Sequence, residues 1–248
     1  KMISVLVTGD TVVEGNEPFF VNLAAAANAL IADGQGVGTI IDDDGPKTIS
    51  VNCASASLQQ ALEAALSGDT VAVTGTCNEN VLVRNDKARV FLDGGGTGVI
   101  HGLDPAGPAI DVRGKAVSIQ GFTITGGTIG IQVQRGASAV INNNAIDGTG
   151  GSGVVVSQQA FAIVTNNTIQ NNAKDGIYVG EGSAARIGFN SGTETTASSN
   201  MIQLNGGSGI RVAGSSSARV VGNMIHNNDV NGVNVDSASQ ADIASNAI

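Results

Sequence analysis

The sequence predicts an all-β solenoid, and three ladders of identical or similar residues predict it. Asn144, Asn167, Asn200, Asn223 and Asn246 recur at steps of 23, 33, 23 and 23 residues, and an Ile follows each of them two positions later. A Gly ladder precedes apolar–x–apolar triplets at Gly130, Gly153, Gly176, Gly209 and Gly232. A fixed period of this size is typical of repeat proteins whose units stack on one another. The longer step is one period plus an insertion, which we place within residues 189–199.

Each unit is predicted to consist of short strands and turns. The units are rich in Gly, Asn, Ser, Thr, Val and Ile and contain no long segment with helical periodicity. A further ladder, Ala139, Ala162, Ala185, Ala218 and Ala241, is followed two residues later by Ile or Val. Period-2 alternation places both rows on the inward face, so we expect coils of a parallel β-helix about 4.8 Å apart. The Asn side chains suit turns, where each amide bonds backbone and the next Asn.

The pattern weakens toward the N-terminus but continues. Residues 81–83, 90–92 and 110–112 are predicted strands of irregular earlier coils. A helix is predicted over residues 57–66, because Ser57 and Gln60 form a capping box and Leu58, Leu62 and Ala65 share one face.

The two cysteines, Cys53 and Cys77, flank this helix. An even number in a Gly- and Asn-rich chain of extracellular character favours a disulfide over two buried thiols. Such a bond closes a loop of about 25 residues and contributes about 3 kcal/mol. A metal or redox centre is not favoured, because no second Cys or His lies at ligand spacing.

Composition restricts the classes of partner. The chain is 42% hydrophobic but only 3% aromatic, which fits a narrow core of Val, Ile and Ala, and its net charge of −9 argues against nucleic acid and anionic membranes. No apolar run is long enough to span a membrane, and no signal peptide is recognisable. Both ends of the sequence lie within strand-like segments, so we expect a piece of a longer protein.

Residues 48–248 resemble secreted bacterial right-handed parallel β-helix proteins of the pectate-lyase-like superfamily. The resemblance rests on Val51-Asn52-Cys53, the segment 58–62, Gly68-Asp69-Thr70-Val71 and the segment 75–81. It implies right-handed coils, a helix that caps the first coil, and a disulfide that ties this cap to the coil. It does not imply one function, since the superfamily includes lyases, hydrolases, epimerases and adhesins.

Residues 3–44 resemble the last strands of a Calx-beta domain, through the segments 9–23 and 31–44. The resemblance implies a partial β-sandwich over residues 1–44, a linker over 45–50 that begins with Gly45-Pro46, and the solenoid over 51–248. Calcium-binding members use acidic residues at the positions matched here by Asp10, Glu14, Glu17, Asp42, Asp43 and Asp44. The alternative is that the terminal Asp run is only a polar edge.

Two outward rows of the coils provide candidate site residues. One contains Val140, Ile163, Arg186, Arg219 and Asp242, and the other contains Asp111, Gln132, Val155, Tyr178, Arg211 and Asn234. Arg186, Arg219 and Asp242 are expected on adjacent coils, where a basic pair beside a carboxylate would hold an acidic sugar and neutralise a uronate before proton abstraction. The alternative is a charged face that only keeps the solenoid soluble.

A second ionisable group lies in the irregular coils. His101, with Asp104, Asp111, Arg113 and Lys115 close in sequence, has the residue types of general acid–base chemistry. His226 lies in a row with Asp147, Gln170 and Gln203 and has no evident partner.

Several absences favour a scaffold over an enzyme. The chain has one Tyr and no Trp to stack on pyranose rings, no paired-carboxylate motif and no G-x-S-x-G elbow. We therefore expect a secreted or cell-surface structural or adhesive module that associates with itself, end to end into fibres, or with other surface or matrix proteins. The alternatives are a lyase- or epimerase-like enzyme or binding module for acidic polysaccharide, assisted by calcium, and a passive spacer. No cofactor other than calcium is expected.

Overall fold

The computed structural model describes residues 4–9, 14–42, 44–189 and 197–248. Residues 1–46 and 47–248 form two compact units, which are described separately. The calcium-site candidates Asp10 and Asp43 and most of the insertion lie outside the described residues.

The unit of residues 1–46 contains a two-stranded antiparallel sheet made of β1 (Glu17–Asn22) and β2 (Gln35–Ile40). Glu17 pairs with Ile40 at one end of this ladder and Asn22 with Gln35 at the other. Gly38 lies under the ring of Phe19, where an added Cβ would stand 2.3 Å from the ring. The assignment of this unit to a Calx-beta sandwich remains a prediction.

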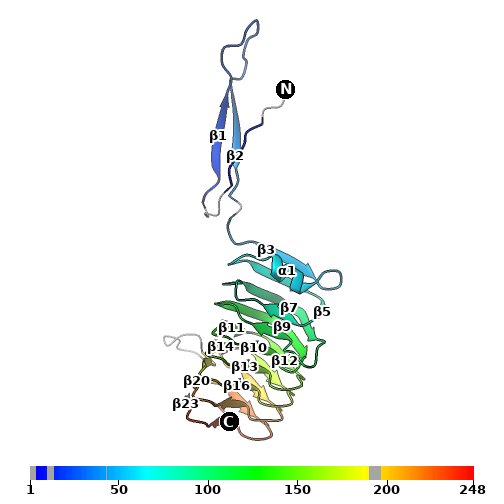
Figure 1. Ribbon diagram of the computed structural model, residues 1–248, viewed down its shortest axis with the longest axis vertical. Coiled ribbons are helices and arrows are strands. Elements are labelled where there is room, and N and C mark those ends of the chain that lie inside the picture. The colour runs from blue at the N-terminus through cyan, green and yellow to red at the C-terminus, as the bar shows by residue number, and fades with distance from the viewer. Residues whose placement is uncertain (1–3, 10–13, 43, 190–196) are drawn as a thin grey trace. The chain divides into compact units, whose positions relative to one another are not determined.

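The unit of residues 47–248 is a parallel solenoid whose coils stack in Figure 1 from β3 and the helix α1 to β23. One side is a seven-stranded sheet of β6 (Val81–Val83), β8 (Ile110–Val112), β10 (Ile131–Val133), β13 (Val154–Val156), β16 (Ile177–Val179), β19 (Ile210–Val212) and β22 (Val233–Val235).

The remaining strands form a fourteen-stranded sheet. It consists of β3 (Thr48–Asn52), β4 (Thr70–Thr74), β5 (Thr76–Asn78), β7 (Phe91–Gly102), β9 (Val117–Gly126), β11 (Ser138–Asn142), β12 (Ala145–Asp147), β14 (Phe161–Thr165), β15 (Thr168–Gln170), β17 (Ala184–Ile187), β18 (Met201–Gln203), β20 (Ser217–Val221), β21 (Met224–His226) and β23 (Gln240–Ala244).

The strand register confirms the predicted coils. Ala139 pairs with Ala162, Ala162 with Ala185, and Ala185 with Ala218, so the 33-residue step keeps the same register as the 23-residue steps. The all-β solenoid predicted from the ladders is therefore confirmed, and the insertion leaves the stacking of the coils unchanged.

The core is a narrow column of aliphatic side chains between the sheets. Ile141, Val164, Ile187 and Val220 form one row with 0% exposure, and Ile146, Ile169, Ile202 and Ile225 form a second. Stacked β-branched residues fit this space because each coil presents the same side chain at the same place.

Two buried amide ladders lie at the turns. In the predicted one, the backbone N–H and Nδ2 of each Asn donate to Oδ1 of the Asn in the next coil, from Asn144 through Asn246. A second ladder runs from Thr149 through Asn172 and Asn205 to Asn228. The ladders satisfy turn amides that would otherwise be buried without partners.

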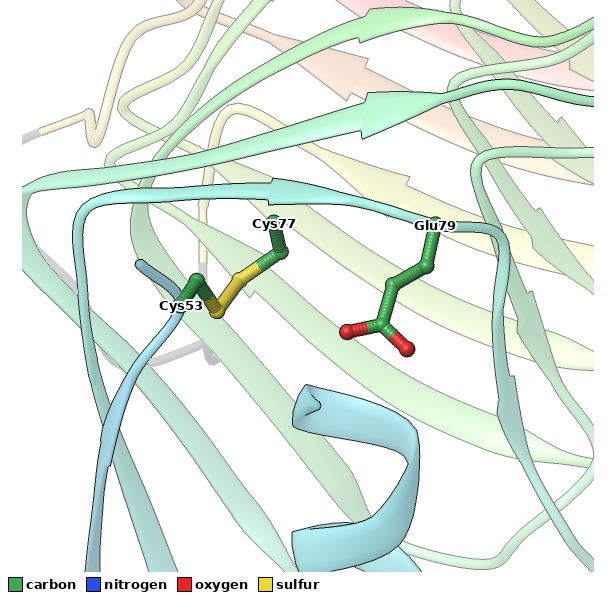
Figure 2. Close-up of side chains that lie close together, drawn as sticks. All are labelled: Cys53, Cys77 and Glu79. Atoms are coloured by element: carbon green, nitrogen blue, oxygen red, sulfur yellow. A yellow bond between two sulfur atoms is a disulfide. The ribbon is translucent and has the colours of Figure 1, made fainter. Parts of the chain in front are cut away.

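The helix α1 (Leu58–Ala64) covers the first coil, with Ser57 as its N-cap. Ser57 Oγ accepts from Gln60 N–H, as in a capping box, but the other free N–H groups are satisfied by Glu79, which accepts from Leu58 N at 2.7 Å and Gln59 N at 3.3 Å. At the other end, Lys87 Nζ donates to the carbonyls of Glu63 and Ala65. The predicted Cys53–Cys77 disulfide is confirmed, and Figure 2 shows it beside the start of the helix, with Glu79.

Candidate functional site

The outer face of the seven-stranded sheet carries one central side chain per coil. The register places Tyr178 of β16 beside Arg211 of β19, with Val155 of β13 one coil before them. The guanidinium carbon of Arg211 lies 5.8 Å from the centroid of the Tyr178 ring. At this distance a cation is attracted to the face of the ring, so the two side chains form one unit.

The next coil holds Arg211 in place. Its Nε donates to Oδ2 of Asp236 at 3.1 Å, and its Nη2 lies 3.1 Å from the same oxygen. Asn234 Nδ2 also donates to this oxygen, at 3.5 Å. The second oxygen of Asp236, Oδ1, is buried and has no hydrogen-bond partner in the described part of the chain. The contacts with Asp236 therefore fix the orientation of the Arg211 guanidinium.

Gly180 explains why the Tyr178 ring lies against the sheet. A Cβ added at Gly180 would stand 2.5 Å from Cε1 and from the hydroxyl oxygen of Tyr178. Only a residue without a side chain leaves room for the ring along its own strand. The ring is half-buried and provides a flat apolar surface on the sheet.

A pocket of about 320 Å³ opens over β13, β16 and β19. Lys174 and Asp175, from the turn before β16, form part of its wall. Asp175 Oδ1 accepts a hydrogen bond from Ser208 N at 2.8 Å and so has a structural role. Lys174 is exposed, and its side chain has no hydrogen bond or ion pair within the described ranges. The other lining residues are Thr128, Ile129, Gly151, Ser152, Val155, Tyr178 and Arg211.

The row of Arg186, Arg219 and Asp242 lies on the fourteen-stranded sheet, and these residues are neighbours on adjacent coils. Arg219 Nε lies 3.0 Å from Asp242 Oδ2, and both side chains are more than half exposed. Phe189 lies under both guanidinium groups, 6.0 Å from Arg186 and 4.8 Å from Arg219. The aromatic contacts and the ion pair account for the positions of these residues without a ligand.

His101 and Asp111 lie in different sheets. His101 belongs to β7 and its Nδ1 is 2.9 Å from Thr125 Oγ1. Asp111 belongs to β8, where it accepts hydrogen bonds from Arg113 at 2.6 and 2.9 Å and from Gln134 at 2.7 Å. The described contacts therefore give Asp111 a structural role and do not join it to His101.

Four of the six calcium-site candidates lie together in the unit of residues 1–46. Glu14, Glu17, Asp42 and Asp44 line a pocket of about 110 Å³. Asp42 Oδ2 already accepts from Glu14 N at 2.9 Å, and Asp42 Oδ1 accepts from Asp44 N at 3.1 Å. Within the described residues, no three of these carboxylates approach as closely as the side chains of Cys53, Cys77 and Glu79 do, within 4.8 Å.

The cluster of Cys53, Cys77 and Glu79 is structural. The two sulfur atoms are bonded to each other, and the Glu79 carboxylate accepts hydrogen bonds from Ser57, Leu58 and Gln59. None of these groups is available to a metal ion in this state.

The sequence placed Tyr178 and Arg211 in one outward row but gave no reason to prefer that row. The signal was present: the chain has a single Tyr, an Arg follows at the same position of the next coil, and a Lys precedes the Tyr by four residues. The composition, with one Tyr and no Trp, predicts few aromatic surfaces, and the half-buried ring of Tyr178 is one such surface.

The fold and its ladders define a parallel β-helix. A family model described as "Right handed beta helix region" matches residues 72–191 and 109–248, which together are more than half of the chain. The chain therefore belongs to the right-handed β-helix family. This agrees with the predicted handedness, whereas nothing tests the Calx-beta resemblance.

Comparison with solved structures finds an alginate lyase from Paenibacillus sp. str. FPU-7, at 18% identity and a TM-score of 0.42, with 81% of this chain and 95% of that chain covered. Comparison with curated proteins finds no match. No helix in the described part of the chain is long and apolar enough to cross a membrane.

Proposed function

We propose that this chain is a secreted or cell-surface adhesive module that binds acidic polysaccharide on its seven-stranded sheet. The observation that carries the proposal is the pocket lined by Lys174, Tyr178 and Arg211, in which the guanidinium of Arg211 lies over the Tyr178 ring and is fixed by Asp236. The chain has a net charge of −9, so a pocket lined by two cations differs in charge from the chain as a whole. The disulfide supports an extracellular location, because such bonds persist in oxidising compartments.

Each group has a distinct task in this proposal. The Tyr178 ring packs against the C–H face of a sugar ring, and Lys174 binds the carboxylate of a uronate unit. Arg211 is held by Asp236 and donates its remaining N–H groups to sugar oxygens. The coils repeat about every 4.8 Å, so an elongated polymer lying across several coils meets each of these groups in turn.

Replacement of Lys174 by Gln tests this site. We expect Lys174→Gln to weaken binding of a hexagalacturonate probe roughly 10- to 100-fold in isothermal titration calorimetry, because one charge-assisted hydrogen bond is lost. Binding to the unchanged chain should weaken as salt is raised.

Arg135→Gln is the matched control, because Arg135 is also exposed and has no described ion pair, but it lies outside the pocket. Equal losses in the two variants would mean that only net charge matters, and the proposed site would be abandoned. The mixtures of the chain with hexagalacturonate also distinguish adhesion from catalysis. Release of unsaturated uronate ends would favour the lyase-like alternative.

We also propose that the acidic pocket of residues 1–46 binds calcium, on the basis of its four carboxylates. Glu17→Gln is expected to weaken calcium binding about tenfold, since a negatively charged oxygen ligand is lost. Calcium titration by calorimetry measures this, with Asp229→Asn, an exposed acid in the other unit, as the control. No heat of binding in the unchanged chain would refute the calcium site.

A second candidate function is end-to-end self-association. Val235, Ile243 and Ile248 are 39%, 45% and 69% exposed, whereas Val212, Val220 and Ile225, at the equivalent positions of the preceding coil, are fully buried. We propose that another coil of the same kind covers this apolar face, and where a second copy provides that coil, repeated stacking builds fibres.

Sedimentation velocity over a range of concentrations tests the association. The unchanged chain is expected to form larger species as concentration rises, and Ile243→Glu is expected to remain monomeric because a buried carboxylate opposes stacking. Leu103→Glu, at a side chain 60% exposed elsewhere, is the control. A monomer at every concentration would rule out assembly through this face.

A further inference from the structure

The fourteen-stranded sheet carries a separate pocket of about 310 Å³ on the outer face of β7, β9 and β11. Phe91, Ser118 and Val140 follow one another in register on three successive coils. Gln120 and Asn142 form a parallel row beside them. This pocket lies in a different sheet from Tyr178 and Arg211, so it is independent of the acidic-polysaccharide site.

The lining offers polar groups that the fold does not use. The side-chain amide of Gln120 and the hydroxyl of Ser118 have no hydrogen-bond partner among the described residues, and both are half-buried. Asn142 is held in place, because its Oδ1 accepts from Thr165 Oγ1 at 3.1 Å and from Asn166 Nδ2 at 2.9 Å. Its own Nδ2 group is left to donate.

The charge of this pocket differs from that of the first. None of its lining residues is ionisable. The nearest ionisable residue in register is Asp93, which pairs with Gln120 and whose Oδ1 accepts from Gly95 N. The first pocket also contains a carboxylate, Asp175, but Lys174 and Arg211 line it as well, whereas no cation lines this second pocket to offset Asp93. The second pocket therefore disfavours uronates.

We propose that this pocket binds an uncharged saccharide. The half-buried Phe91 ring packs against the C–H face of a sugar, while the amides of Gln120 and Asn142 and the Ser118 hydroxyl exchange hydrogen bonds with its hydroxyl groups. One apolar surface with a few convergent neutral donors and acceptors is the composition expected for such a ligand, and the volume lies at the small end of ligand pockets. The protein then holds a neutral glycan on one sheet and an acidic glycan on the other.

The test follows side-chain amide signals by NMR in the full 248-residue chain. Cellohexaose, maltohexaose, xylohexaose and mannohexaose are titrated separately, and hexagalacturonate is titrated in parallel. At least one neutral probe is expected to shift the NH₂ signals of Gln120 and Asn142, and the acidic probe is expected to leave them unchanged.

Three variants assign the binding. Phe91→Ala and Gln120→Leu are each expected to weaken the neutral probe roughly tenfold or more, through loss of the ring contact or of the amide hydrogen bonds. Phe161→Ala, at a half-buried ring on the same sheet but outside the pocket, is expected to leave affinity unchanged. Gln120→Leu removes the amide but keeps a side chain of similar volume. It therefore tests the proposal even if Phe91→Ala does not fold.

The proposal is overturned if no neutral probe shifts Gln120, if the acidic probe shifts it, or if binding survives in both Phe91→Ala and Gln120→Leu. These outcomes do not depend on whether the pocket of Tyr178 and Arg211 binds acidic polysaccharide, which Lys174→Gln tests separately.

Discussion

Asn167→Ala is expected to destabilise the solenoid by about 3 kcal/mol, because it interrupts the amide ladder in mid-solenoid. Asn167 is 1% exposed. Its Nδ2 donates to the carbonyls of Ile141 and Thr165 at 2.9 and 2.8 Å and to Asn200 Oδ1 at 3.0 Å. Its Oδ1 accepts from the backbone and side chain of Asn144 at 2.9 and 3.1 Å.

Alanine removes all of these bonds and leaves Asn144 N without its partner, whereas Thr165 O keeps Asn143 N and Asn200 Oδ1 keeps Asn167 N. A buried group left unpaired costs about 1–3 kcal/mol when no water replaces the lost bond, and the other lost bonds add to this. The measurement is the urea midpoint of unfolding, since the denaturant slope should stay the same if the native coils persist. Asn231→Ala is the control, because Asn231 is exposed and its side chain has no described hydrogen bond. Equal shifts for the two variants would show that the ladder is not a principal source of stability.

Loss of the disulfide in the double variant Cys53→Ser/Cys77→Ser is expected to destabilise the capped end by about 3 kcal/mol. The bond joins residues 24 apart and links the segment before α1 to β5, so its loss frees a loop that contains the whole helix. In the chain-entropy model, loss of the bond raises the conformational entropy of the unfolded loop and so lowers the free energy of unfolding.

Hydrogen exchange distinguishes a local effect from a general one. Amides of α1 and β3 are expected to lose protection in the double variant, whereas amides of β14 and β15 should keep theirs, since each coil contacts only its neighbours. Reductant should reproduce this pattern in the unchanged chain and have no effect on the variant. Uniform loss of protection along the solenoid would contradict the expected locality.

The regular coils could be predicted because their residues repeat. The position of Ile187 follows from that of Val164, and the register survives the insertion because the core row resumes at Val220. The irregular coils were less predictable. The strand expected over residues 90–92 is the start of β7, which continues to Gly102 with a shift of register between Asp93 and Gly98.

The pockets were not predictable in the same way. Lys174 reaches its position through a turn, and the Tyr178 ring lies flat because of Gly180, two residues further on. Neither fact is part of the ladder pattern. Proximity in sequence does not place side chains together in a solenoid, because His101 and Asp111 are ten residues apart but belong to different sheets. Two side chains of one coil can contact each other only if their strands belong to the same sheet or to adjoining turns.

Glu79 has a consequence for the order in which the chain acquires structure. A helix of the seven residues Leu58–Ala64 is too short to persist alone in water, and the carboxylate that binds its first N–H groups belongs to a residue that follows it in the chain. During synthesis the segment 58–64 therefore leaves the ribosome without its partner and waits until residue 79 has emerged. We therefore expect that the cap at the start of the solenoid is not the first part of this unit to fold, and that the coil it covers acts as its template.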